Sequence, residues 1–328
     1  MNKVTLGLSG LEVSPIAFGT WQLGGDWGRF DEREAIGAIR FAREHGINFF
    51  DTAQAYGFGA SEKLLGRALR DDLDARRDEI VIATKGGLRI DAERGLVRDS
   101  SAAWLRAGVE QSLAALAVDH IDLYQLHWPD GATLPAETGS ALKELVQEGK
   151  IRHVGVSNFD AAQMAELART VAVETLQPPY SMLRREIEAE ILPYASEHDI
   201  GVLVYGALAH GLLTGAIDRE ATFAPDDWRS SHPMFAGEAL EHELDIVDAL
   251  RRFAEERGHS VSQLAIAWAL SHPAVHVAIV GSRHQRHIAD SIGALDLHLS
   301  DADLGEIDRI LGGAGAVSVG GPAPEAMP

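Results

Sequence analysis

The chain has 328 residues, of which 46% are hydrophobic, so it can bury a large core in one barrel-sized domain or in two smaller domains. Its 49 acidic residues outnumber its 29 basic ones and give a net charge of −20, which argues against nucleic acid or an anionic membrane as the main partner. The absence of cysteine excludes disulfides, thiolate metal sites and a cysteine nucleophile.

The first residues, MNKVTLGLSGLEV, lack the continuous apolar stretch of a signal peptide, and no later stretch approaches the 18 apolar residues of a membrane span. We therefore expect a cytoplasmic protein. Within this segment, Val4–Val13 alternates around Ser9-Gly10 and predicts a small hairpin.

Short β-branched or aromatic runs then alternate with longer segments of helical period, a pattern typical of βαβ units and a parallel sheet. The predicted strands are Ile16–Gly19, Asn48–Asp51, Ile80–Thr84, Ile121–Leu126, His153–Val156, Thr175–Gln177, Gly201–Tyr205 and His276–Val280. The predicted helices are Asp31–His45, Ser61–Arg70, Ser101–Ala117, Ala136–Glu148, Ala161–Thr170, Glu186–Glu197 and Ser260–Ser271.

Eight such units favour a closed barrel over an open doubly wound sheet. We predict an α/β fold, a (β/α)₈ TIM barrel over residues 1–312 as one domain, with the N-terminal hairpin capping the barrel bottom. Two pieces lie outside the repeat. The long segment from Leu208 to about Glu238 is expected to be a substrate loop, and the Gly/Pro/Ala-rich tail 313–328 is expected to be disordered or to lie over the barrel mouth.

The residues that end the strands matter most, because parallel barrels carry their active sites at the carboxyl ends. Asp51 ends NFFD, Lys85 follows IVIAT, and His127 follows LYQL. A buried Asp51 or Lys85 alone would cost several kcal/mol, so we expect them to pair. With Tyr56 beside this pair, the lysine could stabilise a phenolate, and the tyrosine becomes a general acid for a carbonyl oxygen. A histidine at a strand end is by itself more often structural.

Later strands end in further polar groups, namely Ser157, Asn158, Gln177, Tyr205 and the run Gly281-Ser282-Arg283. Such residues are common where strands leave a core, and Asn158 or Ser282 could simply cap the next helix. No His-x-His pair follows any strand, so we expect no metal.

Several segments resemble the aldo/keto reductase superfamily, and the likeness extends to about residue 312. Phe49–Leu69 (FFDTAQAYGFGASEKLLGRAL) is similar to that superfamily's first signature, IATKGG and QLHWPD follow with its lysine and histidine, and Gly149–Phe159 (GKIRHVGVSNF) resembles its next motif. The resemblance implies that Asp51, Tyr56, Lys85 and His127 form a catalytic tetrad with Tyr56 as the proton donor.

Carbonyl reduction needs a hydride source, and the resemblance implies NADPH, with NADH also possible. No Rossmann glycine motif is present. The residues expected to bind the cofactor are Gly19, Thr20, Trp21, Asp51, Ser157, Asn158, Gln177, Tyr205, Gly206, Ala207, Leu208, Gly211, Leu212, Gly215, Gly281, Ser282, Arg283, His287 and Ser291. By the resemblance, Gly281, Ser282 and Arg283 hold a 2′-phosphate. His287, Ser291 and Ala207 depart from commoner residues of the family.

We therefore expect an NADP-dependent oxidoreductase that interconverts a small carbonyl compound (an aldehyde, ketone or sugar) and an alcohol, with Trp21, Tyr56, His127 and Trp128 contacting the substrate. Two alternatives stay open. The chain could be a cofactor-binding, redox-sensing regulatory subunit, or a lyase that forms a Schiff base on Lys85. The sequence does not indicate the substrate or the oligomeric state.

Overall fold

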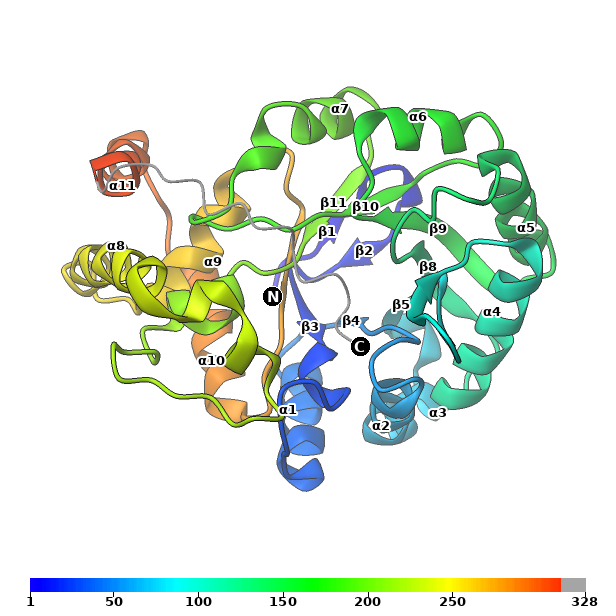
Figure 1. Cartoon of the computed structure of the whole chain (residues 1–328), viewed down its shortest axis with the longest axis horizontal. Helices are drawn as coiled ribbons and strands as arrows, with labels where there is room; N and C mark the ends of the chain where they lie inside the picture. Colours follow the sequence, from blue (N-terminus) through cyan, green and yellow to red (C-terminus); the bar gives the residue numbers. More distant parts are fainter. Residues whose placement is uncertain (314–328) are drawn as a thin grey trace.

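The computed structural model describes residues 1–313, and eight parallel strands form a closed barrel at its centre (Figure 1). Around the barrel the strands are β10 (Thr175–Gln177), β11 (Gly201–Val204), β12 (Val277–Val280), β3 (Ile16–Gly19), β4 (Phe49–Asp51), β5 (Val81–Gly86), β8 (Ile121–Leu126) and β9 (Ile151–Ser157). These are the eight predicted strands, shifted by at most two residues at either end. The predicted (β/α)₈ barrel is confirmed.

Helices surround the barrel and occupy the connections between its strands (Figure 1). They are α1 (Glu32–Glu44), α2 (Ala60–Ala68), α3 (Arg70–Ala75), α4 (Ala102–Leu116), α5 (Pro135–Gln147), α6 (Ala161–Ala168), α7 (Ile191–Glu197), α8 (Gly237–Glu255), α9 (Val261–Ser271), α10 (Gln285–Gly293) and α11 (Asp301–Gly313). Side chains cap several of them. Asp31, Ser101, Asp160 and Ser260 each accept a backbone N–H of the first turn, which explains where those helices begin. Within the described residues, no helix is long and apolar enough to cross a membrane.

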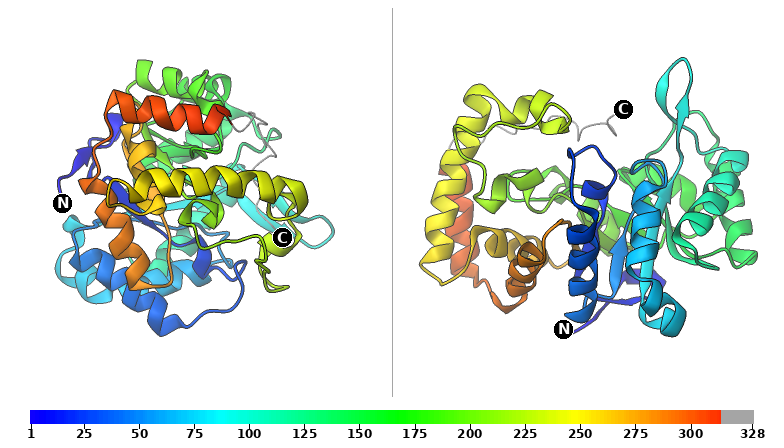
Figure 2. Two further views of the ribbon diagram at one scale, coloured as in Figure 1. Left: turned by 90° about the vertical axis from the view of Figure 1, so that its left-hand side faces the viewer. Right: turned by 90° about the horizontal axis from the view of Figure 1, so that it is seen from below.

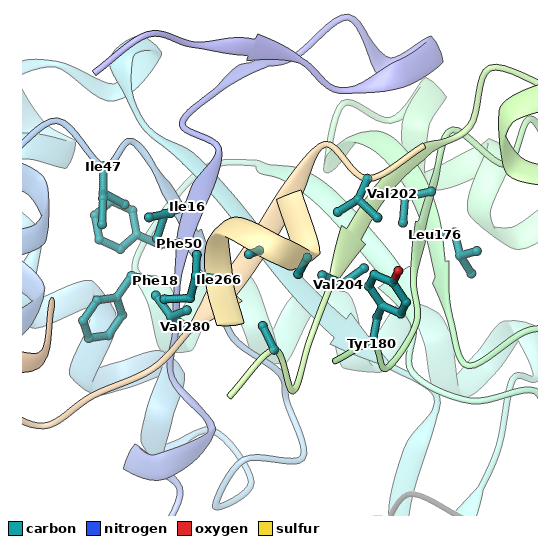
Figure 3. Packing of buried hydrophobic residues seen from close by; sticks show 14 of the residues in the cluster. Ile16, Phe18, Ile47, Phe50, Leu176, Tyr180, Val202, Val204, Ile266 and Val280 are labelled. Carbon is teal, nitrogen blue, oxygen red and sulfur yellow. The ribbon is translucent and has the colours of Figure 1, made fainter. Parts of the chain in front are cut away.

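The molecule has two apolar cores, one outside the barrel wall and one inside it. The larger one packs the outward-facing strand residues against the helices, as Figure 3 shows for Phe18, Phe50 and Ile266. The smaller one fills the barrel interior and consists of Leu6, Val13, Ala17, Phe49, Val81, Ala83, Leu123, Leu203 and Val277. Because successive strand residues face opposite sides, one short strand supplies both cores.

The predicted N-terminal hairpin is present and contributes to the interior core. Strands β1 (Val4–Thr5) and β2 (Glu12–Val13) pair antiparallel and are joined through a 3₁₀ turn at Gly7–Ser9. The turn docks beside β11, where the Leu8 N–H donates to the Asp199 carbonyl at 2.9 Å. The hairpin therefore closes the amino-terminal end of the barrel, so a functional site is expected at the opposite end.

Some elements were not predicted. Strands β6 (Leu88–Asp91) and β7 (Gly95–Arg98) form a hairpin after β5, and Figure 2 shows it projecting at the end of the barrel opposite β1 and β2. Helices α8 and α11 lie outside the predicted repeat and pack against each other. The predicted loop after Leu208 contains 3₁₀ turns at Ala209–Thr214, Trp228–Ser231 and Pro233–Phe235. The predicted tail 313–328 lies outside the described residues, except that Gly313 ends α11.

Candidate active site

A cavity of about 380 Å³ opens at the carboxyl end of the barrel, among the residues that follow the strands. Most of the predicted site residues line this cavity. They are Gly19, Thr20, Trp21, Asp51, Tyr56, His127, Trp128, Ser157, Asn158, Gln177, Tyr205, Gly206, Ala207, Leu208, Gly211, Gly281, Ser282, Arg283 and His287. The barrel topology thus brings together residues that are more than 260 positions apart in the sequence.

Lys85 and Asp51 form an ion pair behind the cavity wall. The Lys85 ammonium donates to Asp51 Oδ1 at 2.6 Å and to the Thr52 carbonyl at 3.0 Å. Lys85 is fully buried and Asp51 is 2% exposed. Burial lowers the pKa of Lys85, and the charge of Asp51 opposes that lowering. The pair predicted from the two strand ends is therefore present, and it is desolvated.

Tyr56 lies in front of this pair, with its hydroxyl 3.3 Å from the lysine nitrogen. Burial raises the pKa of Tyr56 well above its ordinary value, and the carboxylates of Asp51 and Asp26 raise it further. The phenol is therefore protonated at neutral pH. In this state it can donate a proton to an oxygen atom in the cavity, and the lysine is placed to stabilise the phenolate that results.

His127 packs its ring edge-on against Tyr56, with the ring centroids 5.7 Å apart. Burial lowers the pKa of His127 well below its ordinary value, and the positive charge of Lys85 adds to the effect, so the imidazole is neutral. Its Nδ1 atom is buried without a hydrogen-bond partner among the described residues. The residue also lines the cavity, and a neutral imidazole can donate a hydrogen bond from one ring nitrogen to an oxygen there.

A second layer of amides holds the ion pair. Gln177 donates from Nε2 to Asp51 Oδ2 at 2.8 Å, and Gln125 approaches the same oxygen at 3.4 Å. Ser157 donates to the Gln177 carbonyl at 2.9 Å. Sequence reasoning missed Gln125. The signal was its position two residues before His127, since residues two apart in a strand face the same side.

Asn158 connects two walls of the cavity. Its amide nitrogen donates to the His127 carbonyl at 3.0 Å, and its Oδ1 accepts from the Tyr205 hydroxyl at 2.8 Å. The residue has a φ of 61°, in the left-handed region that asparagine tolerates better than most residues. A helix cap is therefore not its role, because Asp160 caps α6.

At the other end of the cavity, Ser282 and His287 lie at the start of α10, with Ser282 Oγ 3.1 Å from His287 Nδ1. No side chain caps this helix at His284. The His287 N–H donates to the His284 carbonyl, and the N–H groups of Gln285 and Arg286 are available to an anion. Arg283 also lines the cavity, and its guanidinium is bound to the protein backbone. It donates to the backbone carbonyls of Gln22, Trp27, Gly28 and Arg29 at 2.8–3.3 Å and thereby holds the loop that follows β3.

Three predicted cofactor residues do not line the cavity. Leu212 is fully buried in the outer core, Ser291 donates to the His287 carbonyl within α10, and Gly215 packs against Arg251. Leu212 and Gly215 each directly follow a residue that lines the cavity, and Ser291 lies one helical turn after His287. Motif spacing alone does not show which of such neighbouring residues faces the cavity.

Aromatic rings from two loops cover one side of the mouth. Trp21 stacks on Tyr56 and on Trp228, and Trp27 packs edge-on against both tryptophans. The backbone fastens the loops together, since the Trp228 N–H donates to the Asp26 carbonyl at 3.0 Å. The segment predicted as a substrate loop therefore reaches the β3–α1 loop directly beside Tyr56.

The family model for the aldo/keto reductases matches residues 15–311. The chain is 39% identical to the aldo-keto reductase YhdN of Bacillus subtilis (strain 168) over 95% of its own length and 94% of the relative's. It is 33% identical to the NADH-specific methylglyoxal reductase of Escherichia coli (strain K12), over 92% and 96% of the two chains. The structure of the glycerol dehydrogenase AKR11B4 from Gluconobacter oxydans is similar, with a TM-score of 0.85, 39% identity, and coverage of 98% of this chain and 97% of that one.

Proposed function

The chain belongs to the aldo/keto reductase family, and we propose that it interconverts a small carbonyl compound and the corresponding alcohol, with Tyr56 as the general acid and base. The observation that supports this proposal most directly is the buried lysine nitrogen, which lies 2.6 Å from Asp51 and 3.3 Å from the Tyr56 hydroxyl. A phenol in contact with a buried ammonium can lose its proton without leaving an unpaired charge.

In the reducing direction, the carbonyl oxygen accepts the proton of Tyr56 as it gains negative charge. The phenolate that remains faces the Lys85 ammonium, which Asp51 holds in place. Because burial raises the pKa of Tyr56, the protonated form dominates at neutral pH, and this form favours reduction. Alcohol oxidation needs the phenolate, so its rate should rise with pH.

His127 is the proposed second contact to the substrate oxygen. Its neutral ring lies against Tyr56, so an oxygen at the tyrosine hydroxyl is within reach of an imidazole N–H. Trp21 and Trp128 also line the cavity and complete the proposed substrate contacts.

Aldo/keto reductases use nicotinamide cofactors, which supply the hydride for this reaction. The polar wall formed by Ser157, Asn158 and Gln177 and the uncapped start of α10 fit the amide and phosphate groups of such a molecule. We propose NADPH as the preferred form, with Ser282, Arg283 and His287 near its 2′-phosphate. To meet a phosphate, Arg283 would have to give up some of its bonds to backbone carbonyls. NADH therefore stays a second candidate, as for the NADH-specific relative.

The test is single-turnover oxidation of NADPH and of NADH by wild-type protein and Tyr56→Phe, with methylglyoxal and glyceraldehyde as carbonyl substrates and glycerol for the reverse direction. We expect Tyr56→Phe to bind cofactor normally and to lose about 10²-fold or more in the rate of hydride transfer. Tyr194→Phe on α7 is the matched control, because Tyr194 does not line the cavity.

Unimpaired hydride transfer in Tyr56→Phe would contradict the role of the tyrosine. Tight cofactor binding by the wild-type protein without turnover of any carbonyl would instead favour the regulatory subunit. A borohydride-stable adduct on Lys85 would favour the lyase.

A further inference from the structure

Asp26 is a carboxylate at the cavity whose charge the proposed chemistry does not use. It lines the cavity, is half-buried, and forms no ion pair with any Lys or Arg among the described residues. The Trp21 side chain donates a hydrogen bond to it, and its negative charge reaches the Tyr56 phenol. A desolvated charge of this kind carries a free-energy cost, so a compensating ligand contact is the natural reason for its presence.

Three elements fix the position of Asp26. The Trp228 N–H binds its carbonyl, and Arg283 binds the carbonyls of the next two residues, Trp27 and Gly28. On the other side, a Cβ built on Gly24 would lie 2.8 Å from the carbonyl carbon of Tyr56, so this loop is packed directly on the tyrosine turn. The carboxylate is therefore held beside the proposed reaction centre on a fixed backbone.

The aromatic residues around Asp26 present edges rather than free faces. Tyr56 and Trp228 stack on Trp21, and the Arg229 guanidinium covers the Trp27 ring at 4.7 Å from its centroid. The cavity therefore offers the Asp26 carboxylate as an acceptor, which is the partner that the O–H donor of a hydroxyl group requires.

We propose that Asp26 is a specificity-determining residue that selects neutral hydroxylated carbonyl compounds and their polyols. In this proposal, which rests on the proposed function, the Asp26 carboxylate accepts a hydrogen bond from a substrate hydroxyl close to the carbonyl group. The same charge repels substrates that carry a carboxylate.

A cationic substrate, such as an amino aldehyde, is the competing ligand for an unpaired carboxylate. The ring arrangement disfavours it, because an ammonium binds to the face of an aromatic ring and is repelled by the positive edge. The face of Trp27 that the Arg229 guanidinium covers is not available to a second cation. Hydroxylated neutral compounds avoid both costs.

The experiment compares wild-type protein, Asp26→Asn and Asp226→Asn with four aldehydes of similar size: glyceraldehyde, propionaldehyde, glyoxylate and 3-aminopropionaldehyde. Asp226→Asn is the matched control, because it removes the same charge from the same mouth at an exposed position that does not line the cavity. Propionaldehyde lacks a hydroxyl, so its turnover reports the basic chemistry alone.

We expect Asp26→Asn to reduce kcat/KM for glyceraldehyde by about 10-fold to 100-fold, the usual value of a hydrogen bond to a charged group. It should raise kcat/KM for glyoxylate and leave propionaldehyde within about threefold, whereas Asp226→Asn should change none of these ratios. An unchanged ratio of glyceraldehyde to propionaldehyde, or a wild-type preference for the amino aldehyde that Asp26→Asn abolishes, would overturn the proposal. Failure of wild-type protein to reduce any of the four aldehydes would contradict the proposed function instead.

Discussion

The Lys85 ammonium is the residue-scale feature on which the other groups of the site depend. It is fully buried and bound to Asp51, so removing it would leave a carboxylate without a counter-charge. We expect Lys85→Met to lose most activity and to lower the free energy of unfolding by about 3–5 kcal/mol. Urea denaturation measures the stability change.

The double variant Asp51→Asn/Lys85→Met serves as its control. It removes the unpaired charge and should recover part of the lost stability while remaining inactive. If the double variant were less stable than Lys85→Met, the buried carboxylate could not be the cause of the destabilisation.

His127 should make the protein sensitive to acid. The fold lowers its pKa, so the unfolded chain binds a proton first as the pH falls below about 6.5. Its contribution to stability is therefore complete above that pH and is lost as the pH falls toward the folded-state pKa. We expect a slope of up to about 1.4 kcal/mol per pH unit from this residue.

Urea denaturation between pH 7 and pH 5 measures this slope, and His127→Gln should make it shallower. The variant should not remove it entirely, because burial also lowers the pKa of His210, to about 4. Equal slopes in wild-type protein and His127→Gln would show that His127 titrates as in the unfolded chain.

Single residues of the site were predictable where chemistry and strand position coincide. Asp51 and Lys85 are charges that directly follow apolar runs, so burial and pairing followed from the sequence. Asp26 gave no such signal, because it lies in a glycine-rich loop whose path depends on Arg283, 257 residues later. The bonds from Arg283 to backbone carbonyls were equally unpredictable. Every residue has a backbone carbonyl, so the sequence does not show which of them will accept a hydrogen bond.

At the scale of elements, Arg283 links the start of α10 to the β3–α1 loop. Its planar guanidinium donates to four backbone carbonyls at once, which a lysine cannot do. We expect Arg283→Lys to increase hydrogen exchange of amides in residues 22–29 and to raise KM for the carbonyl substrate.

Arg283→Lys keeps a positive charge that can bind a phosphate, so its preference for NADPH over NADH should change by less than about threefold. Arg283→Ala removes this charge and should reduce the preference for NADPH further. Arg286→Lys is the control, because Arg286 donates to His287 and, within the described residues, makes no hydrogen bond to this loop. Unchanged exchange in Arg283→Lys would refute the link between the two elements.

Regular elements were predictable when their apolar pattern was repeated, as in the eight strands. The hairpin of β6 and β7 escaped prediction because its residues alternate only weakly and are largely exposed. Helix α8 is amphipathic, but it follows a long irregular segment and falls outside the one-helix-per-strand repeat. Motif spacing also placed Leu212, Gly215 and Ser291 in the cofactor site, although the structure places them behind the cavity.

At the scale of the whole molecule, stability and chemistry lie at opposite ends of the barrel. Leu6 is fully buried in the interior core, whereas Leu8 in the same hairpin is 57% exposed. We expect Leu6→Ala to lower the free energy of unfolding by about 2–5 kcal/mol. Its kcat at 25 °C should not change, because the cavity lies at the other end.

Leu8→Ala is the matched control and should change stability by less than about 0.5 kcal/mol. We also propose that residues 1–312 fold as one domain, so Leu6→Ala should shift a single cooperative transition. Separate transitions for the two halves of the chain, or a loss of kcat in Leu6→Ala, would contradict this division of the molecule.

Tryptophan residues are concentrated at the cavity end of the barrel. Of the six tryptophans in the chain, Trp21, Trp27 and Trp228 form one cluster over the mouth, and Trp128 also lines the cavity. Reduced nicotinamide absorbs light in the range in which tryptophan emits. Because these four tryptophans lie in or beside the cavity, binding of a reduced nicotinamide cofactor should quench the protein's own fluorescence, and a titration can follow binding without an added label.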